Sequence, residues 1–225
     1  MIWATKEGIK MTKQKILLGT TNVGKIESFK LILDKLGYEG VSFADLGISL
    51  EEPEETMPTA KEIAAEKALG YAKQFADLPV LARDDTNVFL GVDEEDDPKN
   101  HNKAFVAQRA GEYTEAKAEM VFAEVAHKYG GKVPIRFDWG YGLAWHNGND
   151  IKVVSALAST NPDDIYLTDK ICEKKFPGFC FAAIMKVRTK AGWKYDSELT
   201  EEEHWETYWN YQKDAIESLL KQYNK

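Results

Sequence analysis

This chain contains two patterns of apolar residues, one typical of strands and one typical of helices. Residues 16–18 form a short apolar run that predicts a buried strand, whereas 25–36 repeats apolar residues every three or four positions, as a helix does. Thr59 and Glu62 have the spacing of a capping box, which announces another helix. The first half is predicted to contain, in order, a strand at 16–18, a helix at 25–36, a strand at 41–43, a helix at 59–76 and a strand at 79–82.

The second half is richer in strand patterning. Apolar and polar residues alternate strictly over 135–146, and Asn147-Gly148 is a favourable hairpin turn. Thr200 and Glu203 form a second capping box before the last helix. The remaining elements expected here are a helix at 114–129 and strands at 151–158 and 179–187. This order, with hairpins in the middle of the chain, predicts a mixed-sheet α/β protein without internal repeats or long linkers.

Composition narrows the class of protein. With 225 residues, 44% of them hydrophobic and 29% charged, the chain is expected to form one domain over 15–225, preceded by an N-terminal extension at 1–14. No apolar run approaches the ~20 residues of a membrane span, and 1–10 lacks the apolar centre of a signal peptide. Cys172 and Cys180 lack a zinc or redox spacing and are expected to be reduced, so the cytoplasm is the expected location.

The net charge of −8 argues against broad nucleic-acid binding, and it also repels anions. A divalent cation between carboxylates and phosphates would resolve this repulsion, so an acidic protein with a phosphate ligand favours a metal.

A glycine-bounded loop at 19–25 follows the first strand and opens the first helix. Backbone N–H groups at such a helix start attract phosphate, and Lys25 adds a positive charge beside them. The loop satisfies most of the P-loop pattern, but Ile26 stands where the metal-binding hydroxyl belongs. It is therefore an altered P-loop, a different phosphate loop whose metal is held elsewhere, or a plain turn.

Three further groups of residues are candidates for chemistry. The carboxylates at 51–55 lie in an acidic loop, and Asp84 and Asp85 follow the strand at 79–82, where ligands often sit in α/β sheets. Adjacent residues there point to opposite sides, so one aspartate faces a ligand while the other supports structure. Lys67 shares the apolar face of its helix. The alternatives are a solvated loop, a polar turn, and a lysine that extends to water along its stem.

Read in order, these segments resemble the inosine/xanthosine triphosphate pyrophosphatase family. Thr20-Thr-Asn-Val-Gly-Lys25 is similar to its T-x-N-x-x-K signature. The stretch from Glu54 to Ala68 is similar to E-E-T-G-x-T-F-x-E-N-A-x-x-K-A, and Leu78 to Thr86 to L-P-x-x-A-D-D-S with one residue inserted. The resemblance covers about 15–90.

This resemblance implies an elongated mixed sheet flanked by helices, with two lobes around a central cleft. It implies a homodimer that hydrolyses a nucleoside triphosphate between its α and β phosphates, with Mg²⁺ or Mn²⁺ as cofactor. Glu55 and Asp85 would bind the metal, and Asp85 would otherwise accept the proton of the attacking water, supported by Asp84 and Lys25. The residues that would contact the substrate are Thr20, Thr21, Asn22, Val23, Gly24, Lys25, Lys67 and Thr86.

Several positions depart from the family pattern. Ser28 stands where members carry a glutamate, and Asn87 replaces the glycine after D-D-S. The base-reading S-H-R motif aligns with 208–210, which reads Tyr-Trp-Asn. The phosphate and metal residues thus resemble the family, while the base-reading half differs, so the preferred base stays open. Two other functions remain as alternatives: a P-loop-like NTPase or kinase that uses 19–25, and a catalytically inactive nucleotide-binding protein.

Overall fold

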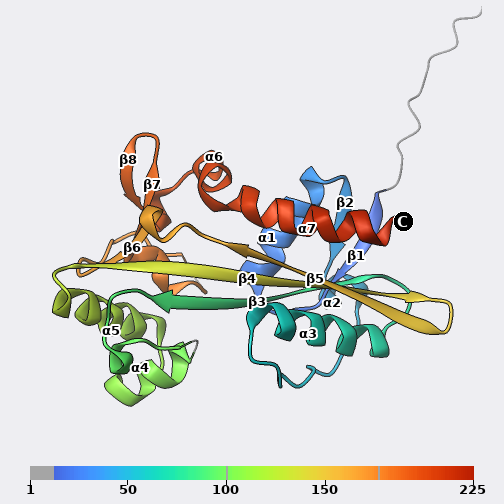
Figure 1. The fold of residues 1–225 in the computed structure, drawn as a ribbon, viewed down its shortest axis with the longest axis horizontal. Coiled ribbons are helices and arrows are strands. Elements are labelled where there is room, and N and C mark those ends of the chain that lie inside the picture. Colours follow the sequence, from blue (N-terminus) through green and yellow to red (C-terminus); the bar gives the residue numbers. More distant parts are fainter. Residues whose placement is uncertain (1–12, 100, 177) are drawn as a thin grey trace, which may run out of the picture.

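The computed structural model describes residues 13–99, 101–176 and 178–225, so residues 1–12 of the extension expected at 1–14 lie outside this part of the chain. Its centre is an eight-stranded sheet in the order β2-β1-β3-β4-β6-β7-β8, with β5 paired to β4 (Figure 1). The strands are β1 (Gln14–Leu18), β2 (Tyr38–Val41), β3 (Val80–Phe89), β4 (Lys132–Asn147), β5 (Asp150–Ser159), β6 (Ile165–Thr168), β7 (Met185–Thr189) and β8 (Gly192–Tyr195).

Seven α-helices of the described residues surround this sheet. They are α1 (Val23–Lys35), α2 (Phe43–Leu46), α3 (Ala60–Gln74), α4 (Asn102–Ala110), α5 (Glu115–Lys128), α6 (Glu201–His204) and α7 (Asn210–Tyr223). β1 pairs with β2 and β3 in parallel, and the other ladders are antiparallel. The prediction of an elongated, mixed α/β sheet flanked by helices is confirmed. None of the helices described here is long and apolar enough to cross a membrane.

The long strands β3 and β4 connect the two ends of the molecule. Figure 1 shows α3 and α7 on opposite sides of them, so β4 is buried on both faces over 139–145. Two glycines of β4 let α3 approach closely: a Cβ at Gly140 would lie 2.1 Å from the carbonyl oxygen of Ala60, and one at Gly142 2.2 Å from that of Ala64. The glycines at alternate positions of the predicted strand are therefore contact points for a helix backbone.

Most predicted elements are present, and their signals have the expected causes. Thr59 caps α3, since its hydroxyl accepts from the backbone N–H of Glu62. Gly37 takes a positive φ of 84° directly after α1, as the C-terminal glycine of a helix does. The last helix begins at the Thr200 capping box and includes a π-helical turn, Trp205–Trp209, before α7. Both cysteines are free, as expected.

The strand predicted at 79–82 is wrong in length. β3 continues to Phe89, so Asp84 and Asp85 lie inside a strand, paired with Gly140 and Trp139, and do not follow its end. The polar run at 83–86 still forms a strand, because its backbone N–H and C=O groups form hydrogen bonds with β4 and these bonds do not depend on the side chains.

Other corrections concern short elements. The segment predicted as a strand at 179–187 begins with a 3₁₀ turn, Cys180–Ala183, and only β7 is extended. The strand predicted at 41–43 is β2, which ends at Val41, because Ser42 caps the short helix α2. The elements α4, β6 and β8 had no predicted counterpart.

Candidate functional site

The site is built where β1 ends and β3 continues. β1 pairs with β3 only through Leu17 with Val80 and Leu18 with Leu81. The Gly19 N–H still donates to the Leu81 carbonyl at 2.8 Å, and then the chain turns away into the loop before α1. Beyond Leu81 this edge of β3 is consequently next to the loop, and the loop's charged residue can reach it.

Asn22 begins α1 and orients Lys25. Its side-chain oxygen accepts from the backbone N–H of Lys25 at 3.0 Å, the bond of an N-cap. The Lys25 Nζ lies 3.2 Å from Asp85 Oδ2 and donates to the carbonyl of Arg83 at 3.3 Å. Thr21, Asn22, Val23 and Gly24 are exposed, and Thr20 is half-buried. The loop therefore presents the first N–H groups of α1 to solvent beside a lysine and an aspartate.

Lys67 connects the acidic loop to β3. Its Nζ lies 2.5 Å from Glu55 Oε1 and 3.6 Å from Asp84 Oδ1. The Lys67 side chain is 12% exposed, Asp84 17% and Glu55 44%. The prediction that Lys67 faces inward is confirmed, and its partners are two of the carboxylates singled out in the sequence. Thr86 is half-buried and, two residues after Asp84, lies on the same face of β3.

Asp85 points to the other side of β3, as the alternation of a strand requires. There it forms an ion pair with Arg83: Nε lies 2.8 Å from Oδ1, and Nη2 donates to Oδ2 at 3.1 Å. Arg83 Nε and Asp85 Oδ1 are close enough for an ion pair, but the Nε–H bond does not point at Oδ1, so the two atoms form no hydrogen bond. Asp85 thus has two cationic neighbours, Arg83 and Lys25.

The two aspartates differ in their acidity. Burial raises the pKa of Asp84, and this outweighs the opposing influence of Lys25 and Lys67. Burial also acts to raise the pKa of Asp85, but Arg83 and Lys25 outweigh it and hold that pKa below its usual range. Burial disfavours the charged form of Lys67, yet the bond to Glu55 and the charge of Asp84 leave its pKa raised. Asp85 is the more firmly ionised member of the pair.

Arg83 was not singled out by its sequence pattern, although it lies at the centre of this network. Its Nη1 donates to Ser28 Oγ at 3.1 Å and to Gln212 Oε1 at 3.2 Å. Gln212, in α7, also accepts from the Tyr141 hydroxyl at 2.7 Å and is 2% exposed. The available signal was the Arg-x-Asp spacing within a strand, which puts both side chains on one face.

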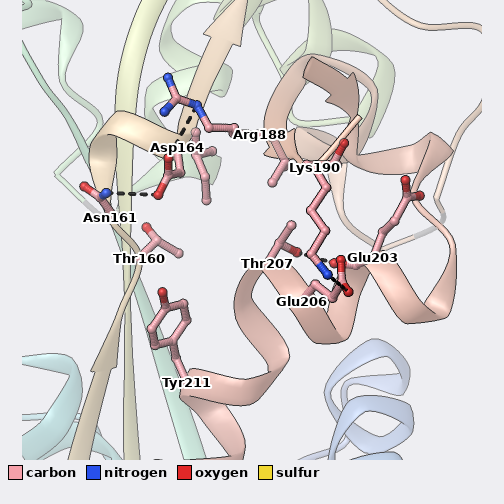
Figure 2. Close-up of a pocket in the computed structure, with 12 residues that line it drawn as sticks. Thr160, Asn161, Asp164, Arg188, Lys190, Glu203, Glu206, Thr207 and Tyr211 are labelled. Atoms are coloured by element: carbon pink, nitrogen blue, oxygen red, sulfur yellow. Dashed lines mark hydrogen bonds and ion pairs between the residues drawn. The ribbon is translucent and has the colours of Figure 1, made fainter. Parts of the chain in front are cut away.

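Other polar clusters lie elsewhere. A cavity of about 300 Å³ between the β6–β7 region and the last helix is lined by Asp164, Arg188, Lys190 and Glu206, which pair as Arg188 with Asp164 and Lys190 with Glu206 (Figure 2). A second, of about 450 Å³, is bordered by Lys132. Neither cavity is lined by Lys25, Lys67 or the aspartate pair.

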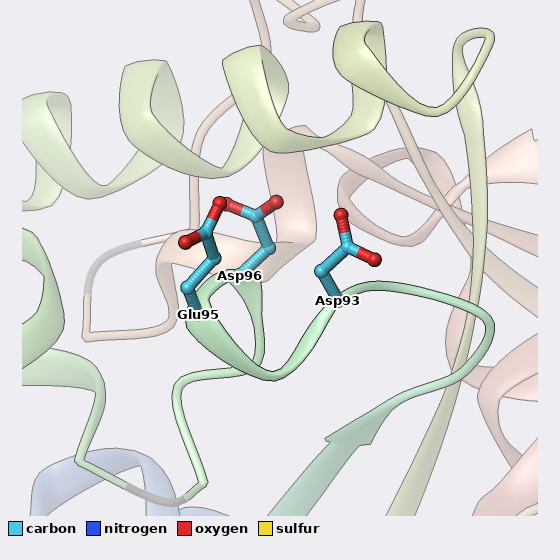
Figure 3. A group of neighbouring side chains, drawn as sticks. All are labelled: Asp93, Glu95 and Asp96. Atoms are coloured by element: carbon cyan, nitrogen blue, oxygen red, sulfur yellow. The ribbon is translucent and has the colours of Figure 1, made fainter.

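An acidic cluster follows β3 in the loop that contains Asp93, Glu95 and Asp96 (Figure 3). The Lys128 Nζ lies within 3.5 Å of all three carboxylates, and Arg109 lies 2.8 Å from Asp96. Protein cations already neutralise this group, so it is a charge network that joins the loop to α4 and α5.

A comparison with known protein families identifies the family of this chain. A sequence profile of the Ham1 family matches residues 16–132, which include every residue of the network described above except Tyr141 and Gln212. This chain belongs to the Ham1 family. The resemblance seen in the three motifs is thereby confirmed.

Relatives of this Ham1-family chain include two proteins named dITP/XTP pyrophosphatase. The one from Haemophilus influenzae is 38% identical over 117 residues, which is 51% of this chain and 55% of the relative. The one from Mannheimia succiniciproducens is 44% identical over 72 residues, 32% of this chain and 35% of the relative. The chain thus spans about half the length of the first relative and about a third of the second.

Two solved structures share the fold over nearly the whole chain. A HAM1 protein from Coxiella burnetii has a TM-score of 0.61 at 18% identity, over 93% of this chain and 99% of that one. A nucleoside-triphosphatase, dITP/XTP pyrophosphatase, from Mycobacterium abscessus has a TM-score of 0.54 at 19% identity, over 92% and 99%. The Ham1 fold therefore extends beyond the part of the sequence that matches the family profile.

Proposed function

We propose that this protein is a Mg²⁺-dependent nucleoside triphosphate pyrophosphatase. One observation carries the proposal: two lysines and three carboxylates from four segments form two ion-paired groups, Lys25 with Asp85 on one face of β3 and Lys67 with Glu55 and Asp84 on the other. These are the loop lysine Lys25, the helix lysine Lys67, and Glu55, Asp84 and Asp85. Such an arrangement suits a phosphate chain with a divalent cation, and the relatives' names point to the same substrate class.

Each residue of the site has a proposed role in binding the phosphates or in the hydrolysis. The N–H groups of 20–25 and the ammonium groups of Lys25 and Lys67 bind the phosphates and stabilise the charge that develops on the leaving pyrophosphate. A water attacks the α phosphorus, the bond from that phosphorus to the bridging oxygen breaks, and pyrophosphate leaves from a nucleoside monophosphate. Asp85, which Arg83 and Lys25 hold ionised, accepts the water's proton, and Thr86 lies close to the substrate.

The donor set fits a hard divalent cation. Glu55 and Asp84 offer carboxylate oxygens, which Mg²⁺ prefers as ligands, and they share one lysine at ion-pair distance. Mg²⁺ or Mn²⁺ would be held by Glu55 and one of the aspartates, where it would offset phosphate charge and acidify water.

A P-loop NTPase or kinase is less well supported. Ile26, which occupies the place of the P-loop hydroxyl, packs partly buried against the hydrophobic core. Its side chain therefore belongs to the packing of α1, and Ile26→Thr is expected to add no ATPase activity.

The proposal is tested with a panel of nucleoside triphosphates that carry normal, deaminated and modified bases. Pyrophosphate and phosphate are measured separately, with and without Mg²⁺. We expect Mg²⁺-dependent pyrophosphate release from at least one nucleotide, and a loss of about 100-fold in Lys25→Met. Lys30→Met is the control, because Lys30 lies on the same helix and pairs with Asp45. Tight nucleotide binding without turnover at any Mg²⁺ or Mn²⁺ concentration would identify a binding protein instead.

A further inference from the structure

The two adjacent aspartates have unlike cationic surroundings. Both oxygens of Asp85 are in contact with protein cations: Oδ1 with Arg83, and Oδ2 with Arg83 and Lys25. Asp84 instead shares the single ammonium of Lys67 with Glu55, at the longer distance of 3.6 Å. A third cation at Asp85 would be repelled by two neighbours in contact, whereas one between Asp84 and Glu55 would meet two carboxylates and one lysine at ion-pair distance, with Lys25 acting from farther away.

Arg83, which pairs with Asp85, is held more rigidly than Lys67, which pairs with Asp84. Arg83 is 12% exposed, lies 5.8 Å from the ring centre of Phe29, and is bound by Ser28 and Gln212. Gln212 is itself fixed by the hydroxyl of Tyr141, so its oxygen points at the guanidinium. Lys67 pairs with a carboxylate of an exposed loop, and its flexible stem allows the ammonium to turn toward a phosphate.

Resting on the proposed function, we propose that Arg83 is a built-in cation that positions Asp85, and that the exchangeable divalent cation binds on the other side of β3, between Asp84 and Glu55. Arg83 is thus a positioning residue, and Asp84 takes the metal-binding place that the motif resemblance gives to Asp85.

Two departures from the family motifs meet at this point. Ser28 stands where a glutamate is expected, and the inserted residue of the L-P-x-x-A-D-D-S segment lies next to the aspartates, where Arg83 now stands. Although 55 positions apart, Ser28 Oγ and Arg83 Nη1 are 3.1 Å from each other. Where the family motif has an acidic side chain, this chain has a small hydroxyl beside the guanidinium of Arg83, which balances the charge of Asp85 within the protein.

The metal assignment is tested without nucleotide, by Mn²⁺ binding measured from the electron paramagnetic resonance of the free ion and by calorimetry with Mg²⁺. We expect Asp84→Asn and Glu55→Gln each to weaken Mn²⁺ binding at least tenfold, and Asp85→Asn to change it less than threefold. Binding lost in Asp85→Asn but kept in Asp84→Asn would overturn the assignment, as would a wild-type protein that binds no Mn²⁺. This measurement needs no turnover, so its failure is separate from a failure to release pyrophosphate.

The role of Arg83 is tested with Arg83→Met, Arg83→Lys and a matched control. Arg136 precedes Asp138 on β4 with the same spacing and lies 3.0 Å from it, but outside the network, so Arg136→Met is the control. We expect Arg83→Met to lower kcat at least tenfold with KM changed less than threefold, and Arg83→Lys or added guanidinium ion to restore part of that loss.

An Arg83→Met protein that is folded by circular dichroism but keeps its kcat would overturn the positioning role. Equal losses in Arg136→Met would do the same. If Arg83→Met does not fold, Arg83→Lys with the Asp84→Asn and Asp85→Asn binding measurements still decides the proposal, because none of them removes the buried charge of Arg83.

Discussion

Lys67 carries a charge into a position that is only 12% exposed, and the two carboxylates that meet it there explain why it is stable. At an effective dielectric constant of about 20, opposite unit charges ~4 Å apart attract by about 4 kcal/mol, enough to offset part of the cost of leaving water. The inward direction of Lys67 was predictable from its helical spacing, but its partners come from two other segments and required the fold.

Lys67→Met is expected to lower the rate of pyrophosphate release about 100-fold, because the phosphates lose a cation fixed in a partly dry site. The rate is measured under saturating Mg²⁺. Lys73→Met, an exposed position on the same helix, is the control and keeps the wild-type rate. Equal rates in both variants would remove Lys67 from the site.

A second buried acid lies under the last helix. Asp196 is 4% exposed and accepts a hydrogen bond from the Tyr208 hydroxyl. Burial raises the pKa of Asp196 to about 6, while burial lowers the pKa of His204, whose Nδ1 is 3.9 Å away, to about 4. The folded protein therefore binds a proton at Asp196 more tightly than the unfolded chain does, and at His204 less tightly.

The pH dependence of stability follows from these directions. Between about pH 4 and pH 6, Asp196 makes the free energy of unfolding fall as pH rises, and His204 makes it rise, so the two offset each other. In Asp196→Asn only the histidine remains, and stability is expected to gain on the order of 2 kcal/mol more than in wild type from pH 4 to pH 6. Urea unfolding at both pH values measures this difference. Parallel wild-type and variant profiles would contradict the buried charge states.

At the scale of elements, the sequence predicted which helices and strands are present better than it predicted where they end. Apolar periodicity identified α1, and capping boxes marked α3 and the final helix, because capping and burial are local signals. β3 appeared to end at Ala82 because polar residues follow, yet it pairs with β4 through to Phe89 with Ile135. Asp84 and Asp85 find the lysines Lys67 and Lys25 across the fold, which hydropathy along one segment does not reveal.

The contact of α3 with β4 depends on two glycines. In Gly140→Ala, the new Cβ would lie 2.1 Å from the carbonyl oxygen of Ala60, a backbone atom that cannot rotate away. We expect a loss of about 2–3 kcal/mol in the free energy of unfolding, measured by urea titration. Gly24→Ala, whose Cβ would meet nothing closer than 3.4 Å, is the control and keeps the wild-type value. A tolerated Gly140→Ala would show that α3 is not seated as described.

At the scale of the whole molecule, the similarity in sequence covers a shorter part of the chain than the similarity in fold. The Ham1 profile ends at residue 132, whereas the structural similarity covers 93% of the chain. The second half shares the fold, whereas its sequence at 208–210 differs from the base-reading S-H-R motif of the resembled family. Recognition of a base depends on a few side chains, so the fold alone does not specify it.

The central claim concerns which phosphate bond is broken, and product analysis of the most active nucleotide tests it directly. The reaction products are separated by ion-exchange chromatography in the presence of Mg²⁺. Nucleoside monophosphate and pyrophosphate in equal amounts is the predicted result, because the lysines and carboxylates are proposed to act at the bond between the α and β phosphates. Nucleoside diphosphate with single phosphate would contradict the proposal.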